Sequence, residues 1–116
     1  MIHLDYQNRM PIYEQIVLEI ERYVALGILK PQDQLMSIRE MATTLGINPN
    51  TVKKAYTELE NKGVIITIST KGTFIADNIT RIIEDKIEEK IIEINKIVED
   101  LQKLGISKEE IIKRIV

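Results

Sequence analysis

The chain has 116 residues and a mass of 13.4 kDa, which is enough for about one compact domain, or a small domain with an appendage, and leaves little room for a multidomain enzyme. Sixteen basic and 18 acidic side chains give a formal net charge of -2 and a pI near 5.5, so the bulk charge does not indicate a nucleic-acid partner. Cysteine is absent, which excludes disulfide scaffolds, thiolate zinc sites and thiol nucleophiles.

The first predicted helix begins at Pro11, because the fixed φ of proline suits the first position of a helix. Apolar residues recur every fourth position over residues 12–24, and Gly27 ends the helix. Ahead of this helix, Ile2 and Leu4 alternate with polar residues. That alternation indicates a short edge strand.

Two further helices follow closely. Ser37 and Glu40 have the spacing of a capping box, and Gly46 can take the left-handed conformation that ends a helix. Asn48 is a good N-cap for the next helix, with Pro49 as its first residue. Both helices have apolar residues at i, i+3, i+4 and i+7: Ile38, Met41, Ala42 and Leu45 in the first, and Val52, Ala55, Tyr56 and Leu59 in the second.

Two short helices joined by a tight turn are typical of a helix-turn-helix. After Gly63, the β-branched stretch Val64–Ile68 and the stretch Thr73–Ala76 indicate a hairpin, which is a wing when it follows such a helix. The predicted fold class is therefore mainly α (α+β). It comprises a winged helix-turn-helix over residues 1–76 and a helical region over residues 77–116.

The second helix of the helix-turn-helix directs a polar face away from its apolar stripe. Glu58, at the edge of this face, is its one acidic residue. The face comprises Asn50, Lys54, Thr57 and Asn61, with Lys53 on its flank.

Several short motifs occur in unbroken order along about 65 residues of this first part. They are Pro11-Ile12-Tyr13, Gly27-Ile28-Leu29-Lys30-Pro31, Ser37-Ile38-Arg39-Glu40, Leu45-Gly46-Ile47-Asn48-Pro49-Asn50-Thr51-Val52, Ala55-Tyr56-Thr57-Glu58-Leu59-Glu60 and Lys71-Gly72-Thr73-Phe74. Together they resemble the GntR family of bacterial transcription regulators. That resemblance implies a winged-helix domain that binds double-stranded DNA.

The start of a recognition helix lies deepest in the major groove, where the helix amino terminus adds a partial positive charge. At this point Asn50 and Lys53 can donate to base edges, while Thr51 and Lys54 can reach a base or a phosphate. Lysines taken alone are more often solvated helix residues, and Thr51 can equally support the first turn of its helix. The capped and spaced framework around the lysines favours DNA contact.

Similarity to the family further implies that Arg39, on the preceding helix, touches the DNA backbone or a base. At the wing tip, Lys71 and Gly72 are expected to approach the minor groove, where lysine meets a negative potential and glycine permits close backbone contact. The stretch Ile68–Thr70 departs from the basic and glycine residues of many relatives, which predicts weaker wing contact. Gln32 also replaces a usual glycine.

Residues 1–76 contain eight basic and eight acidic side chains, whereas residues 77–116 contain eight and ten, so the net charge of -2 belongs to the second part. A helix is predicted from Ile79 to Leu104, followed by a capping box at Ser107 and Glu110. The first of these helices has an aliphatic stripe wider than a simple coiled-coil seam. The stripe residues assigned to dimerisation are Ile83, Ile87, Ile91, Ile94, Val98 and Leu101.

Two helices cannot enclose an independent core or an ordinary ligand cavity, so the stripe needs a partner. Packing on the winged helix of the same chain is one solution, but one small domain cannot cover so long a stripe, and a second subunit is favoured. The short helical tail resembles the YtrA subfamily. That resemblance implies a homodimer, and frequently control of a neighbouring transporter operon. No residue pattern indicates an effector, a metal or a cofactor.

An enzyme and a protein-binding module are the two alternative function classes. An enzyme is disfavoured because His3, the only histidine, lies near the terminus and no phosphate loop, nucleophile elbow or acid pair is visible. A winged-helix module that binds proteins rather than DNA remains an alternative, against which the acid-poor helix face argues. With apolar runs of at most four residues and no visible signal peptide, we expect a soluble cytoplasmic protein without a membrane partner.

Overall fold

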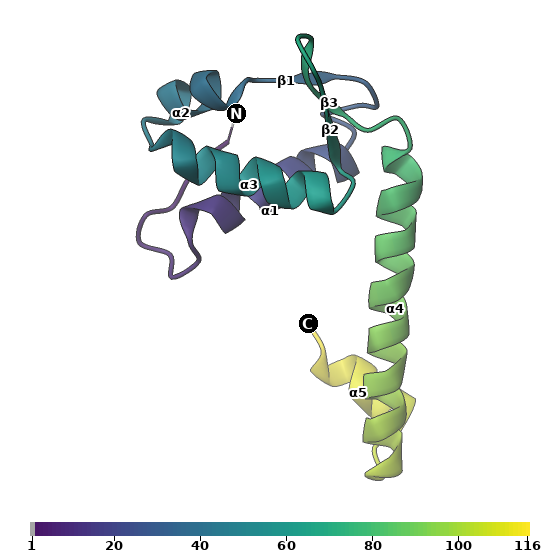
Figure 1. Ribbon diagram of the computed structural model, residues 1–116. Coiled ribbons are helices and arrows are strands. Elements are labelled where there is room, and N and C mark those ends of the chain that lie inside the picture. Colours follow the sequence, from purple (N-terminus) through teal and green to yellow (C-terminus); the bar gives the residue numbers. More distant parts are fainter. Residues whose placement is uncertain (1) are drawn as a thin grey trace. The chain divides into compact units, whose positions relative to one another are not determined.

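The computed structural model describes residues 2–116, which divide into one compact unit ending at Ile82 and a second unit, Ile83–Val116. Helices predominate, with one small antiparallel sheet, and the predicted fold class is confirmed (Figure 1). The elements are α1 (Ile12–Ala25), β1 (Gln34–Leu35), α2 (Ile38–Leu45), α3 (Pro49–Asn61), β2 (Ile65–Ile68), β3 (Gly72–Ile75), α4 (Ile79–Lys103) and α5 (Lys108–Arg114).

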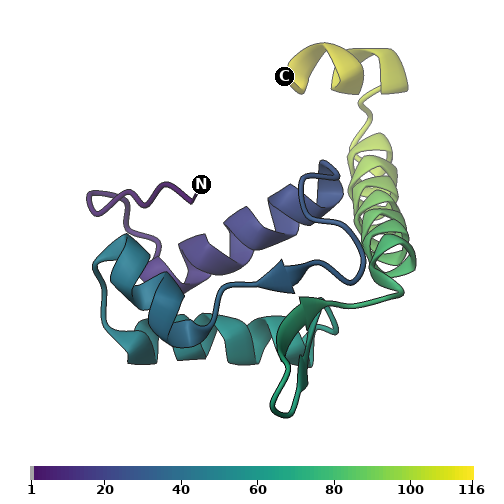
Figure 2. The same cartoon turned by 90° about the horizontal axis from the view of Figure 1, so that it is seen from above.

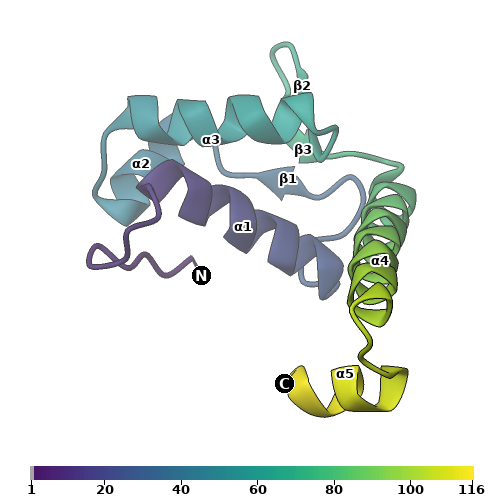
Figure 3. The same cartoon turned by 90° about the horizontal axis from the view of Figure 1, so that it is seen from below.

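The core of the first unit is aliphatic and lies where α3 packs against α1, α2 and the hairpin. Ile16 and Ile20 of α1, Val52 and Leu59 of α3, and Ile75 of β3 have at most 1% of their surface exposed. The four helical positions among these follow the predicted helical spacing. The wing, formed by β2 and β3, follows α3 directly, and its turn protrudes from the unit (Figures 1 and 3).

The predicted caps of α2 and α3 are confirmed. Ser37 Oγ accepts from Glu40 N at 3.1 Å, and Glu40 Oε1 accepts from Ser37 N at 3.4 Å, which completes the capping box. Gly46 is left-handed at φ 68°, and Asn48 Oδ1 accepts from the amide of the second residue of α3 at 2.8 Å. Pro11 needs a correction, because its extended ψ of 148° makes it the N-cap of α1 rather than the first helical residue.

The sheet has the strand order β1-β3-β2, with every pair antiparallel. The hairpin was predicted, but β1 was not, because its two residues are too few to show an alternating pattern. This strand pairs Gln34 with Phe74 and Leu35 with Thr73, and it lies alongside the hairpin (Figure 2). It therefore joins the segment before α2 to the wing.

The edge strand predicted at Ile2 and Leu4 is wrong, because these residues adopt no strand conformation. The buried side chain of Gln15 instead forms the hydrogen bonds with the backbone of this segment that a neighbouring strand would have formed. Its Oε1 accepts from Asp5 N at 2.8 Å, and its Nε2 donates to the carbonyls of Asp5 and Met10, both at 2.9 Å. One glutamine thus fixes the segment that enters α1.

The second unit contains most of α4, the turn at Gly105, and α5. Ser107 Oγ caps α5 by accepting from Glu110 N at 3.2 Å, but the reciprocal half of the predicted capping box does not form, since Glu110 Oε1 instead accepts from Arg114 Nε at 3.2 Å. Within Ile83–Val116, all of which the structure describes, Ile111 is the only buried hydrophobic residue. The aliphatic stripe of α4 is therefore not covered by α5.

Two residues other than glycine have a positive φ within the first unit: Gln32 at 70° and Thr70 at 67°. Left-handed backbone costs such residues roughly 1–2 kcal/mol. This conformation at Gln32 is one that glycine adopts without strain, which agrees with the glycine that the family resemblance implies at this position. Gln32 N donates to Ile75 O at 3.0 Å, so pairing with the sheet holds the strained conformation in place.

Candidate nucleic-acid interface

Helix α3 buries one side completely and exposes the other. Val52, Ala55 and Leu59 have 0% of their surface exposed. On the opposite side, a shallow groove follows the helix, and its lining combines three residues predicted to contact DNA with neighbours of the same face. The groove is lined by Tyr13, Asn50, Lys53, Lys54, Thr57, Glu58 and Asn61.

Tyr13 of α1 is part of this surface and was not predicted to be. The Nζ atom of Lys54 lies 4.1 Å from the centre of the Tyr13 ring, a cation–π contact between α1 and α3. The hydroxyl of Tyr13 donates to Glu14 Oε1 at 3.1 Å, and this hydrogen bond raises the pKa of Tyr13 above its ordinary value. The available sequence signal was an aromatic residue at the margin of an otherwise aliphatic stripe.

The other predicted residues lie outside the groove. Thr51 is half-buried and lines a second hollow with Pro11 and Ile12, at the junction of α3 with the start of α1. Arg39 is exposed on the first turn of α2. Lys71 and Gly72 lie at the wing tip, where Lys71 is exposed. The proposed contacts thus come from three separate elements of the first unit.

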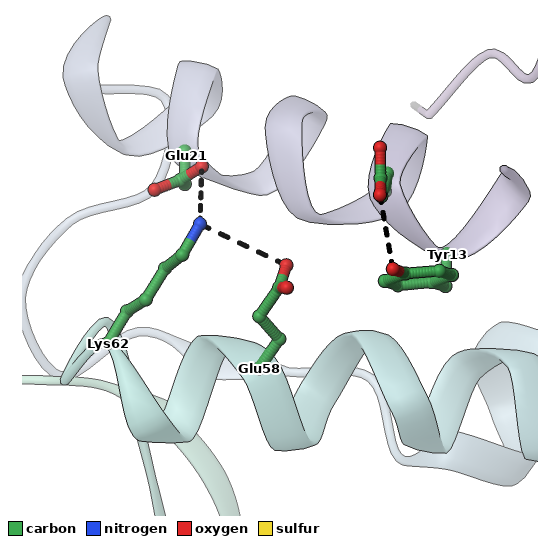
Figure 4. Close-up of polar contacts among 5 residues, drawn as sticks. Tyr13, Glu21, Glu58 and Lys62 are labelled. Carbon is green, nitrogen blue, oxygen red and sulfur yellow. Dashed lines mark hydrogen bonds and ion pairs between the residues drawn. The ribbon is translucent and has the colours of Figure 1, made fainter. Parts of the chain in front are cut away.

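An ion-pair cluster reduces the negative charge at the far end of the groove. Lys62 Nζ lies 3.9 Å from Glu58 Oε2 and 3.8 Å from Glu21 Oε1 of α1 (Figure 4). The first turn of α3 contains no acidic residue. Positive potential is therefore concentrated toward the amino-terminal half of α3, where Lys53 and Lys54 add to the partial charge of the helix terminus.

A buried tyrosine ties α3 to the segment before α2. Tyr56 is 2% exposed, and its hydroxyl donates to the carbonyl of Met36 at 2.7 Å. Burial raises the pKa of Tyr56 well above its ordinary value, because the ionised form would lose its hydration. This contact fixes the orientation in which α3 presents its outer face.

The sequence profile described as "Bacterial regulatory proteins, gntR family" matches residues 12–75. The match covers more than half of the chain and runs from the start of α1 to the end of the wing. The chain belongs to this family. The resemblance inferred from its motifs is confirmed.

This GntR-family regulator is 39% identical over 112 residues to the HTH-type transcriptional repressor YtrA of Bacillus subtilis (strain 168), covering 96% of this chain and 86% of that relative. It is also similar to the crystal structure of a transcriptional regulator from Oenococcus oeni, with 38% identity, a TM-score of 0.76 and coverage of 97% and 94% of the two chains. The DNA-binding domain of AraR in complex with operator ORE1 is similar at 25% identity and a TM-score of 0.56, covering 66% of this chain and 93% of that domain.

Family membership makes the chain a DNA-binding transcription regulator of the winged helix-turn-helix type and not an enzyme. It decides against a winged helix that only binds proteins. Across residues 2–116, no cluster of three or more His, Asp or Glu residues could hold a metal ion. No helix in the described part of the chain is long and apolar enough to cross a bilayer.

The Tyr56 contact generates a pH-dependent prediction. The folded-state pKa of Tyr56 is raised above its ordinary value near 10, so its contribution to stability is present below that pH and is lost as the pH rises above it. Tyr56→Phe should lower the free energy of unfolding at pH 8 by about 1–2 kcal/mol, because Met36 O loses its donor. Urea unfolding between pH 8 and 11 should also show a shallower alkaline decline in this variant.

Tyr6→Phe is the matched control, because Tyr6 is 67% exposed. This variant should keep the wild-type stability at pH 8 and the wild-type alkaline decline. An identical pH dependence in Tyr56→Phe and wild type would contradict the role assigned to the buried hydroxyl.

Proposed function

We propose that this regulator is a homodimeric repressor that binds a palindromic operator through α3 of each copy. The observation that carries the proposal is the groove along α3, in which Asn50, Lys53 and Lys54 share one face that no acidic residue enters before Glu58. The name of the similar Bacillus protein, a transcriptional repressor, supports repression. The similar AraR domain is described in complex with an operator, which supports this mode of action.

Each contact residue has a role that follows from its chemistry. The Asn50 amide can pair with adenine in the major groove, and Lys53 can donate to a guanine edge. Lys54, held over the Tyr13 ring, and Thr51, half-buried at the helix start, are suited to phosphate oxygens, which fix the register of α3 on the duplex. Arg39 adds a backbone or base contact from α2, while Lys71 and Gly72 approach the minor groove.

The acidic pI does not oppose this function. Residues 1–76 are electrically neutral, and the excess of acidic residues lies in residues 77–116. The electrostatic field at a DNA phosphate is set by nearby charges, because charges separated by more than about 10 Å are screened at moderate salt. The two lysines of α3 and the helix amino terminus therefore determine the attraction.

The partner proposed for α4 is a second copy of this chain. The aliphatic side chains on one side of α4 are exposed or half-buried. The second unit contains no core that could cover them. Apolar surface left in water costs about 25 cal/mol per Å², which a second copy of the same stripe would remove. The residues assigned to this interface are Ile83, Ile87, Ile91, Ile94, Val98 and Leu101.

A two-fold dimer explains how a small reading surface can reach operator specificity. Two copies of α3 would enter successive major grooves on one face of the duplex, with half-sites about one helical turn apart. Control of a neighbouring transporter operon is part of the proposal and rests on the resemblance to the YtrA subfamily. The site of action is the cytoplasm, where bacterial DNA lies. No effector is assigned.

The DNA face is tested with Lys53→Ala/Lys54→Ala and a duplex from the region upstream of the protein's own gene. Loss of two phosphate or base contacts should weaken binding at least about tenfold, and each lost phosphate contact should reduce the slope of log affinity against log salt by about one. Fluorescence anisotropy at several salt concentrations measures both quantities.

The matched control, Lys96→Ala/Lys103→Ala, removes two exposed lysines of α4 and should keep most of the affinity. Full affinity and an unchanged salt slope in the α3 variant would show that the assigned face is wrong.

The dimer is tested by making the same change, isoleucine to glutamate, at two positions on opposite sides of α4. Ile94 and Ile92 are 52% and 50% exposed, and two helical steps place them about 200° apart around the axis. Ile94→Glu introduces a charge into the proposed interface and should give a monomer by light scattering. Ile92→Glu should leave the dimer intact. A dimeric mass for Ile94→Glu would contradict the assignment of this stripe.

A further inference from the structure

The wing tip has a tightly defined backbone. Lys71 N donates to Ile68 O at 3.0 Å, which closes a four-residue turn between β2 and β3. Thr70 lies in this turn at φ 67°, a conformation that a β-branched residue adopts at a cost, and Gly72 follows at φ 123°. A turn that contains such strain persists only when its surroundings hold it.

The side chain of Gln34 supplies a contact of this kind. Gln34 is in β1 and lies opposite Phe74 of β3, so its side chain lies beside the base of the wing turn. Its Nε2 donates to the carbonyl of Lys71 at 3.3 Å. Because the two residues are 37 positions apart in the sequence, this bond attaches the wing turn to the segment that precedes α2.

Gly72 fits closely beneath the same side chain. A Cβ atom added at residue 72 would lie 2.7 Å from Gln34 Nε2, which is closer than real side chains approach. The positive φ favours glycine at this position, and the short distance shows that the end of the Gln34 side chain lies directly against residue 72. Gln34, although exposed, therefore contacts the wing turn at both Lys71 and Gly72.

We propose that Gln34 is a positioning residue for DNA binding, which holds the wing turn so that Lys71 and Gly72 are set for the minor groove before DNA arrives. This inference rests on the proposed DNA-binding role of the wing. The stretch Ile68–Thr70 lacks the basic residues that would draw a mobile wing to phosphate. A wing fixed in advance loses less conformational entropy on binding, which offsets part of that missing charge.

The contact of Gln34 with the wing turn, which we call the brace, is tested first in the free protein. Gln34→Met keeps the length of the side chain, is neutral and removes the amide donor. Heteronuclear NOE measurements on ¹⁵N-labelled protein should show faster motion at the Lys71 and Gly72 amides in this variant than in wild type, with the amides of α3 unchanged. Gln7→Met, on the exposed segment before α1, is the matched control and should leave the wing as ordered as in wild type. Unchanged order at Lys71 and Gly72 in Gln34→Met would overturn the inference without any use of DNA.

The second arm uses the upstream duplex. Gln34→Met should weaken binding about twofold to tenfold, the range set by one hydrogen bond, and the weakening should shrink toward none when Lys71→Ala is already present. Thermal unfolding of Gln34→Met close to that of wild type excludes a general loss of structure. Equal weakening in both backgrounds would show that Gln34 does not act by setting Lys71, which contradicts the proposal.

The two failures are distinguishable. If wild type binds the duplex and Lys71→Ala weakens binding while Gln34→Met does not, the proposed function stands and the positioning role is wrong. If Gln34→Met loosens the wing but wild type does not bind DNA, the brace is real and the proposed function fails, and with it the role of the brace in DNA binding.

Discussion

The burial of one side of α3 is the constraint on which the rest of the interface depends. Val52, Ala55 and Leu59 are completely buried on the side where α3 packs against α1, α2 and the hairpin, so α3 can neither rotate nor slide without opening the core. Tyr56 adds a directional bond from α3 to Met36. The polar residues on the opposite side are therefore presented to the solvent in a fixed array, which is the condition for reading base edges.

Local chemistry could be predicted for the caps of α2 and α3, but not fully for α5, where Glu110 pairs with Arg114 and only half of the predicted capping box forms. The capping box at Ser37 and Glu40, the Asn48 cap and the left-handed Gly46 are all formed by residues close together in the chain, and each could be predicted. The groove residues of α3 could be predicted for the same reason, since helical spacing alone places Asn50, Lys53 and Lys54 away from the buried stripe.

Other features that sequence reasoning missed depend on side chains that bond the backbone of a segment outside their own helix or strand. Gln15 replaces the predicted edge strand by bonding the backbone of Asp5 and Met10, and Gln34 reaches the turn at Lys71. No sequence pattern around a single glutamine predicts which backbone group its side chain will bond. The strand β1 was missed because it is defined by its pairing with β3 rather than by a pattern of its own.

The division of charge and apolar surface between the units supports the proposed assembly. The neutral first unit has an aliphatic core, whereas the acidic second unit has one buried hydrophobic residue among the positions that the structure describes. Isoleucine, which occurs 23 times in the chain, forms most of the exposed stripe of α4. DNA reading and dimerisation are thus proposed for different parts of a short chain, coupled by the two-fold symmetry of an operator.

The absence of cysteine permits one direct test of this account. A chain carrying only Thr57→Cys can be labelled at a single point on the outer face of α3 with an iron–EDTA group, which cleaves nearby DNA. On the upstream duplex, the account predicts two cleaved patches related by two-fold symmetry and separated by about one helical turn, 10–10.5 base pairs between centres. Cleavage at one patch alone, or spread evenly along the duplex, would contradict it.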